Sequence, residues 1–266
     1  MSSHPQSVGE HLREWRQRRR MSQLDLALAA NVSARHLSFI ETGRARPSRE
    51  MVLHLCERLG VPYRERNSCL LAAGYAPVFP QRSLDDPAMI HARRAVDLVL
   101  AGHEPYPALA VDRHWQLVAA NRAVAHLIAG ASDELLAPPV NVLRLSLHPR
   151  GLGSRILNYR EWRDHILSRL NQQIDASADP VLIALCEELS SFPGPAERRS
   201  SAAGLLPNAV VTPLRLKTDA GILSLFSTTT VFGTPVDVTL TELAIEAFFP
   251  ADAETGERLR ALSARS

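Results

Sequence analysis

The sequence has few of the features that mark membrane-spanning or disulfide-stabilised proteins. No apolar run in its 266 residues approaches the ~18 residues needed to cross a bilayer, and residues 1–20 contain no hydrophobic core of a signal peptide. The three cysteines, Cys56, Cys69 and Cys186, are odd in number and widely spaced, which is typical of reduced thiols and not of a disulfide framework. We therefore expect a cytoplasmic protein with no membrane partner.

The common catalytic motifs are also missing. The chain contains no G-x-S-x-G, H-E-x-x-H, Walker or C-x-x-C pattern. Its ten histidines are scattered without the spacing of metal ligands, and no pair of carboxylates stands out. The sequence thus predicts no enzymatic activity, no metal site and no cofactor.

Basic residues are concentrated in the first part of the chain. Residues 1–80 contain 12 arginines and seven acidic residues, a net charge of +5, whereas the remainder carries a net charge of −3. This asymmetry favours a nucleic-acid-binding head followed by a separate body.

Five short helices are predicted before residue 75. Apolar spacing and capping residues place them at 8–20, 22–30, 33–42, 48–59 and 62–73. Ser22, Ser33 and Ser48 are expected to cap three of the helix starts. Asp25, three residues after Ser22, adds a capping-box pattern. Gly43 is expected to end the third helix, because glycine readily adopts a left-handed backbone.

Residues 21–48 have the pattern of a helix-turn-helix unit. Only Asn31 and Val32 separate the second helix from the third, so the two helices must cross steeply. The segment resembles the Cro/C1-type family, also called the xenobiotic response element family, at Ser22, Gln23, Leu26, Ala27, Val32, Ser33, Ser38, Ile40, Glu41, Gly43, Pro47 and Ser48. The resemblance covers about residues 7–73. It implies a lambda-repressor-like helix-turn-helix DNA-binding domain over residues 1–75, with a double-stranded DNA operator as partner.

The same resemblance makes residues 33–42 the recognition helix. It places His36 at the edge of this helix, and at the base-facing positions it places Ala34, Arg35, Ser38 and Phe39.

General physical chemistry adds phosphate and base contacts to this set. Ser33 begins the recognition helix, and free N–H groups at a helix N-terminus bind phosphates. The planar guanidinium of Arg35 matches guanine O6 and N7. Gln23, Arg44 and Arg46 are expected to contact backbone phosphates.

The arginines at the end of the first helix have two interpretations. They form a solvated face that suits a helix C-terminus, or they contact phosphates. Either interpretation applies to Arg16, Arg18, Arg19 and Arg20. Trp15 is expected in the core, and Glu41 is expected to form a structural bond within the head.

Residues 76–104 are predicted to form a linker and a connecting helix at 88–101, and residues 105–266 a second domain. Its first strands, at 108–112 and 115–120, form a hairpin around a turn at 112–114. The further elements are helices at 121–128, 161–173, 179–189 and 254–264, a loop at 191–206, and strands at 209–216 and 222–232, joined by a turn at 217–221. The stretch 241–249 fits a strand, which we favour, or a helix. Hairpin-connected strands imply an α+β fold whose antiparallel sheet has helices against one face and a helical insertion.

The resemblance extends into this second domain. The chain is similar to the MmyB-like (MltR-type) regulators at 35–44, 62–67, 72–77, 104–108, 112–115, 121–123, 141–144, 147–149 and 232–235. These regulators have a PAS-like ligand-binding domain, and a small hydrophobic molecule such as a fatty acid is their suggested effector. The resemblance therefore implies a ligand-responsive transcriptional regulator.

The inward faces of the strands are the natural lining of such a ligand site. The apolar candidates are Leu109, Val111, Trp115, Leu117, Val211, Leu223, Leu225 and Phe248. The polar candidates are Asn121, Asn141, Arg144 and His148. Arg144 either holds a carboxylate through a bidentate pair or forms a salt bridge that anchors the helical insertion.

A small head joined to a large body by a short linker favours a homodimer. Two heads must meet major grooves about one helical turn, ~34 Å, apart. An alternative makes the body a dimerisation or protein-interaction module that binds no small ligand, because a sensor sheet and a dimerisation sheet share one hydrophobic pattern.

Overall fold

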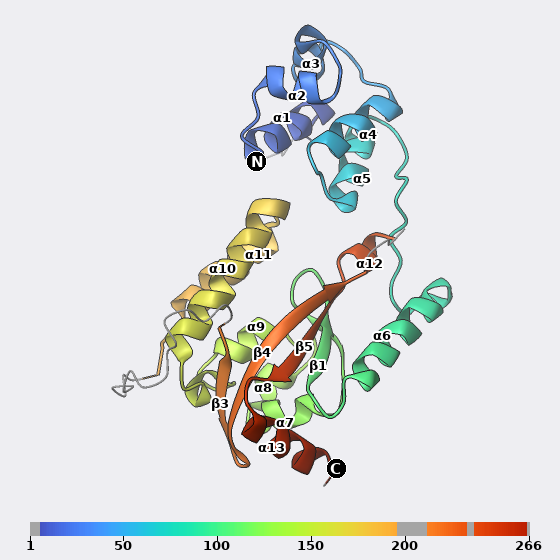
Figure 1. The fold of residues 1–266 in the computed structure, drawn as a ribbon. Helices are drawn as coiled ribbons and strands as arrows, with labels where there is room; N and C mark the ends of the chain where they lie inside the picture. Colours follow the sequence, from blue (N-terminus) through green and yellow to red (C-terminus); the bar gives the residue numbers. More distant parts are fainter. Residues whose placement is uncertain (1–5, 196–211, 233–236, 265–266) are drawn as a thin grey trace. The chain divides into compact units, whose positions relative to one another are not determined.

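The computed structural model describes residues 6–195, 212–232 and 237–264 and divides the chain into two compact units. The head unit comprises Met1–Arg82 together with Pro235–Thr241, and the body unit comprises Ser83–Thr234 and Glu242–Ser266 (Figure 1). Each unit has its own hydrophobic core. The body therefore contributes one short segment of its sequence to the head unit.

Six helices make up the described part of the head unit. They are α1 (Val8–Arg18), α2 (Gln23–Ala29), α3 (Ala34–Glu41), α4 (Arg49–Arg58), α5 (Tyr63–Ala72) and α12 (Val238–Thr241). The first five coincide with the predicted helices to within two residues at each end, and α12 was not predicted. Leu12, Leu26, Leu37, Leu55 and Leu70 are fully buried at the centre of the core.

The predicted serine caps explain where these helices begin. The hydroxyl oxygens of Ser22, Ser33 and Ser48 each accept a hydrogen bond from the backbone N–H three residues on, and Asp25 completes the capping box predicted for α2. Gly43 follows α3 with a φ of +72°, which is costly for residues with a Cβ. The first residues of α2, α3 and α4 and the last residue of α3 are thus determined by the local sequence.

A buried ion pair joins the first and third helices of the head. Nε and Nη2 of Arg16 donate to the two carboxylate oxygens of Glu41 at 2.7 and 2.9 Å, and Arg16 Nη1 donates to the carbonyl of Met21 at 2.8 Å. The pair corrects the prediction for Arg16, which lies neither on a solvated face nor on a phosphate-binding surface. The Arg19 guanidinium donates to the carbonyls of Leu59 and Gly60, so its role is also structural.

The body unit is built on a five-stranded antiparallel sheet of order β2-β1-β5-β4-β3. The strands are β1 (Ala108–Val111), β2 (Leu117–Ala120), β3 (Leu214–Thr218), β4 (Gly221–Val231) and β5 (Ala244–Pro250). This arrangement confirms the predicted α+β PAS-like fold. The ambiguous stretch 241–249 is divided: its first residue ends α12, and the strand begins at Ala244.

Several other predicted bounds need correction. The helix predicted at 161–173 extends over Tyr159–Ser177, and within the described residues the strand predicted at 209–216 begins only at Leu214. The turn predicted at 217–221 is shorter, because Lys217 and Thr218 pair with Ile222 and Gly221. The helix predicted at 121–128 begins only at Val124. Asn121 lies before it because its side chain binds the backbone around Ala108 instead.

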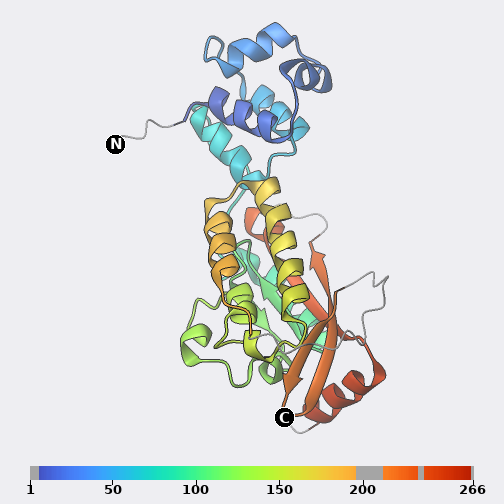
Figure 2. The ribbon, with the colours of Figure 1, turned by 90° about the vertical axis from the view of Figure 1, so that its left-hand side faces the viewer.

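Helices cover both faces of the sheet. This corrects the sequence-based prediction, which placed helices against one face only. The helices are η1 (Pro87–Met89), α6 (Ile90–Gly102), α7 (Val124–Ile128), α8 (Asp133–Leu136), α9 (Val142–Leu147), η2 (Gly153–Arg155), α10 (Tyr159–Ser177), α11 (Pro180–Ser191) and α13 (Ala253–Ser263). The long helices α10 and α11 run side by side (Figure 2). The unpredicted α8 and α9 have only four and six residues, fewer than two helical turns, so an apolar helical pattern cannot repeat along them.

The two faces have different side chains. Leu109, Leu223 and Leu225 belong to the large core that includes Trp162 and Leu170 of α10. A smaller core on the other face packs Val96 and Leu100 of α6 against Ala108, Ala110 and Ile245. The alanines let α6 lie close to the strands. Among the described residues, no helix is long and apolar enough to cross a membrane.

We predict that Glu41→Ala destabilises the head unit by ~3–5 kcal/mol, because it leaves the buried Arg16 guanidinium without its counter-ion. Urea unfolding of the full chain, read by hydrogen exchange in peptides of α1 to α5, measures the loss. Glu57→Ala, at an exposed position of α4, is the matched control and should change stability by less than ~0.5 kcal/mol. An equal effect of both substitutions would contradict the assigned role.

The same pair makes the stability of the head depend on pH. Burial alone would raise the pKa of the Glu41 carboxyl, but hydrogen bonds from Arg16 and Gln23 outweigh it and lower that pKa below its ordinary value. The contribution of Glu41 is therefore complete above the unfolded pKa of about 4.3 and is lost as the pH falls through the lower folded pKa. The Glu41→Ala variant should lack this part of the acid destabilisation.

Candidate functional site

The exposed face of α3 presents the residues predicted to read bases. Arg35 and His36 are exposed, while Ala34, Ser38 and Phe39 are half-buried. The Arg35 guanidinium lies 5.4 Å from the centroid of the Phe39 ring, within the range of a cation–π contact. Both side chains thus lie together on one turn of the helix.

The amino end of α3 supplies backbone donors. Ser33 caps the helix, and its hydroxyl accepts from the N–H of His36 at 3.1 Å. The N–H groups before His36 lie in the first turn of the helix, where intrahelical acceptors are lacking. They are suited to an anionic partner such as a phosphate.

Gln23 is held by the buried ion pair. Its Nε2 donates to Glu41 Oε2 at 2.8 Å, on the same carboxylate that binds Arg16. One N–H of the amide is therefore used within the head, and the other remains for the predicted phosphate contact. The hydrogen bond that Gln23 donates to Glu41 fixes the orientation of the Gln23 amide.

The two arginines after α3 differ in their surroundings. Both are exposed, but the Arg46 guanidinium donates to the carbonyl of Ala73 at 3.2 Å, which ties it to the end of α5. For Arg44 and Arg46 alike, phosphate binding stays a prediction.

In the body, most of the apolar ligand candidates lie in one place. Leu109, Val111, Trp115, Leu223 and Leu225 are buried in the large core, and Leu117 and Phe248 pack against it. Val211 lies outside the described residues. The strands and α10 therefore bring together an apolar region, and whether it holds ligand stays a prediction.

Two of the polar candidates make structural hydrogen bonds. Asn121 Oδ1 accepts from the N–H of Ala108, and its Nδ2 donates to the carbonyls of Leu100 and Tyr106. Asn141 caps α9 by accepting from the N–H of Arg144, and it donates to the carbonyl of His114. These bonds position the ends of β1 and α9.

Arg144 and His148 also have partners within the body. Arg144 donates to both carboxylate oxygens of Glu188 at 2.5 and 2.7 Å. These bonds lower the pKa of Glu188. They occupy the guanidinium fork, a geometry that matches the salt-bridge interpretation and joins α9 to α11. His148 Nδ1 accepts from the N–H of Arg150, and its ring meets Phe192 edge-on at 5.0 Å.

Sequence reasoning missed a charged pair on the inner face of the sheet. Glu246 of β5 is only 3% exposed, and its carboxylate accepts from Arg169 of α10 at 2.7 Å and from the Thr229 hydroxyl at 2.7 Å. The Arg169 guanidinium also lies 5.1 Å from the ring centroid of Trp115. The sequence did contain a signal of this pair, because Glu246 is the one acidic residue in the otherwise apolar run 243–249.

Trp115 is constrained at both its ring and its backbone. Its indole N–H donates to Gln173 of α10 at 2.8 Å, and its backbone φ is +64°, rare for a bulky side chain. Nearby on α10, burial and the Arg169 charge lower the pKa of His165. Trp115 thus joins the β1–β2 turn to the Arg169–Glu246 pair.

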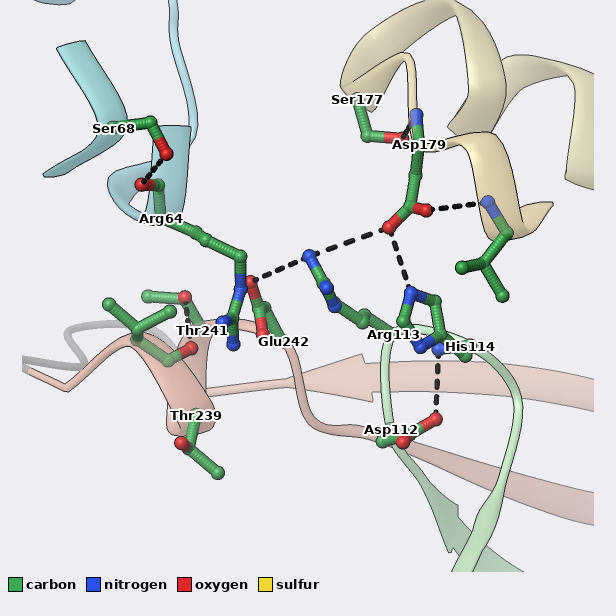
Figure 3. A network of polar contacts seen from close by, with 12 residues as sticks. Arg64, Ser68, Asp112, Arg113, His114, Ser177, Asp179, Thr239, Thr241 and Glu242 are labelled. Atoms are coloured by element: carbon green, nitrogen blue, oxygen red, sulfur yellow. Dashed lines mark hydrogen bonds and ion pairs between the residues drawn. The ribbon is translucent and has the colours of Figure 1, made fainter. Parts of the chain in front are cut away.

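A second polar cluster surrounds the β1–β2 turn (Figure 3). Asp179, the N-cap of α11, lies 2.8 Å from His114 Nε2 and 3.4 Å from Arg113 Nη1. Burial alone would raise the pKa of Asp179, but these neighbours and the N–H of Val181 lower it. Arg113 also lies 3.8 Å from Glu242. This cluster joins the turn to α11 and to the residue that follows α12.

The segment between β4 and β5 is bonded into the head unit. We call residues 237–241, which include α12, the strap. The N–H of Val238 donates to the carbonyl of Pro80 at 2.8 Å, and the Thr239 hydroxyl donates to the carbonyl of Arg82 at 2.6 Å. Arg82 Nη1 lies 3.3 Å from the buried carboxylate of Asp237. The strap therefore binds the chain that leaves α5.

That stretch of chain is itself held by α5. Asn67 of α5 accepts from the N–H groups of Val78 and Phe79 and donates to the carbonyl of Phe79. The Phe79 ring stacks on Tyr63 at 4.3 Å. Within the head unit, α5, residues 78–82 and the strap thus form a continuous set of hydrogen bonds.

Two protein-family models match the chain, one in the head and one in the body. Residues 7–68 match a helix-turn-helix domain, and residues 92–262 match the MmyB-like transcription regulator ligand binding domain. No curated protein matches. A solved structure, titled "Structure of an RNA-binding Light-Oxygen-Voltage Receptor", is similar with 15% sequence identity and a TM-score of 0.30. The match covers 99% of this chain, which spans 64% of the length of that chain.

We predict that Arg35→Ala relaxes base specificity at one operator position by ~1–3 kcal/mol. The salt-dependent, nonspecific part of the affinity should be largely kept. Fluorescence anisotropy with a selected operator and its single-base variants, at several salt concentrations, measures both. Arg215→Ala, at an exposed position of β3, is the control. A uniform loss across all sequences would instead place Arg35 on phosphates.

For the inner charged pair, we predict that Arg169→Ala lowers body stability by ~3–5 kcal/mol, because Glu246 is left buried without a counter-ion. The double variant with Glu246→Ala should be more stable than Arg169→Ala alone, since it removes the unpaired charge. A double-mutant cycle by urea denaturation measures the coupling. Additive effects of the two substitutions would show that the charges act independently.

Proposed function

Because the chain belongs to the family of MmyB-like regulators, with a helix-turn-helix domain and a ligand-binding domain, we propose that a small hydrophobic effector in the body controls its binding to operator DNA. The effector class is an amphiphile with an apolar chain, of fatty-acid type. The observation that carries this proposal is the strap, a body segment that is bonded into the head unit.

The lining of the body core supports the effector class. Its inner sheet face is supplied mainly by leucines, and an apolar chain gains ~25 cal/mol for each Å² of apolar surface that it removes from water. The Arg169–Glu246 pair is a charged group within this apolar surrounding. A ligand with one polar end and one apolar end matches that composition.

The strap supports the coupling of effector to DNA. It connects β4 to β5, and these strands are paired over seven residue pairs. A ligand that alters this pairing moves the ends of a segment whose hydrogen bonds lie in the head unit. An effector acts only through different affinities for the two resulting arrangements, and a coupling free energy of ~1–3 kcal/mol is typical.

A homodimer completes the proposal. Two heads on one near-palindromic operator must lie about one helical turn, ~34 Å, apart. An effector that changes the position of each head then changes the fit to both half-sites. In this proposal the hydrophobic effector therefore controls how the dimer binds its double-stranded DNA operator.

We predict that delipidated protein binds its operator with an affinity that saturated fatty acids of graded length change by roughly 5- to 150-fold. Fluorescence anisotropy of labelled operator measures this change, and native mass spectrometry measures effector stoichiometry. Methyl esters of the same acids test the need for the charged end. Binding of no small molecule, with unchanged operator affinity, would favour a protein-interaction module instead.

Variants of the strap separate effector binding from its consequence. Thr239→Val removes the hydroxyl that donates to Arg82 while keeping the side-chain shape. It should preserve fatty-acid binding and reduce the change in operator affinity. Thr228→Val, at an exposed position of β4, is the matched control. A full response in Thr239→Val would exclude the strap as the route of coupling.

A further inference from the structure

The helix α6 has two apolar faces, and only one of them is covered. Val96 and Leu100 are buried against the sheet. Ile90 and Leu98 are 62% and 64% exposed. In Figure 1, α6 lies on the opposite side of the sheet from α10 and α11. Those two helices therefore cannot cover its outer face.

The exposed residues form one stripe along the helix. Ile90, Arg94, Leu98 and Ala101 follow one another at intervals of four, four and three residues, and all are exposed. This spacing places them on the same helix face. Large apolar side chains that are exposed together and rimmed by polar residues mark an interaction surface.

Two charged residues, Arg94 on this stripe and Asp97 beside it, lack ion-pair partners within the described chain. Arg94 and Asp97 are both exposed, and neither takes part in an ion pair between described residues. The neighbouring Arg93, by comparison, is bonded to Asp85 at 2.7 Å. The stripe thus presents one free positive and one free negative group, three residues apart.

We propose that the occupant of this stripe is α6 of a second copy of the chain, packed antiparallel about a two-fold axis. With the axis at the level of residues 95 and 96, Arg94 of each copy faces Asp97 of the partner copy. Ile90 then meets Ala101, and Leu98 packs close to the axis. Each contact occurs twice, as a two-fold interface requires. The stripe is therefore complementary to itself in charge.

This interface rests on the homodimer of the proposed function and identifies the surface through which the two copies associate. A helix of 13 residues is about 20 Å long, so one helix pair buries less than the ~800 Å² per partner of a standard interface. We therefore expect a dissociation constant on the order of micromolar in free solution. Two heads on adjacent half-sites strengthen the association through effective concentration.

Sedimentation velocity of the full chain over a concentration series tests the interface. Wild type should dimerise, and Leu98→Glu should be monomeric at the same concentrations. Arg94→Asp and Asp97→Arg should each weaken dimerisation roughly tenfold or more, because like charges then face each other. The double variant should recover most of the loss. Val181→Glu, on an exposed residue of α11, is the matched control and should leave the dimer intact.

The interface would be overturned by a Leu98→Glu variant that dimerises like wild type, or by a double variant that dimerises no more strongly than the single variants. A wild type that is monomeric both free and on operator DNA would also overturn it. Circular dichroism of each variant verifies folding. Fatty-acid binding is measured separately. If the effector changes operator affinity but Leu98→Glu still dimerises like wild type, only the interface is rejected. If the variants confirm the interface but no fatty acid binds, only the proposed effector is rejected.

Discussion

The antiparallel pairing of β4 with β5 is the constraint on which the rest of this structure depends. It sets the register in which Glu246 of β5 lies opposite Thr229 of β4, and this places the Glu246 carboxylate where Arg169 of α10 donates to it. The same pairing determines where the strap begins and ends. The strap is bonded into the head unit, so the chain that links these two strands includes residues of the head unit.

In the head, one buried carboxylate joins three helices. Glu41 receives hydrogen bonds from Arg16 and Gln23, and thereby joins α1, the start of α2 and the end of α3. A buried charge is tolerated only when it is paired and hydrogen-bonded, so these contacts specify one arrangement of the three helices. One outcome is that Gln23, a predicted phosphate ligand, is oriented by a core interaction. A hydrogen bond thus connects the predicted DNA-binding face to the core of the head.

In the body, polar side chains mainly join elements that lie far apart in sequence. Asp179 joins the β1–β2 turn to the start of α11, and Arg144 joins α9 to α11. Trp115 connects the same turn to α10 through Gln173 and Arg169. The helices and the sheet therefore enclose an apolar region whose rim is held by directional contacts.

The sequence by itself determined the helices of the head, because serine caps, terminating glycines and apolar periodicity are local signals that act within a few residues. It also determined the family, through the motifs of the recognition helix and of the body. It did not reveal α8, α9 or α12, which are too short to show a helical period, or the partners of Arg16, Arg144 and Glu246. Those partners lie 25, 44 and 77 residues away in the chain. Only the tertiary structure decided them, because a long-range contact depends on how separate elements pack and leaves no pattern in the local sequence.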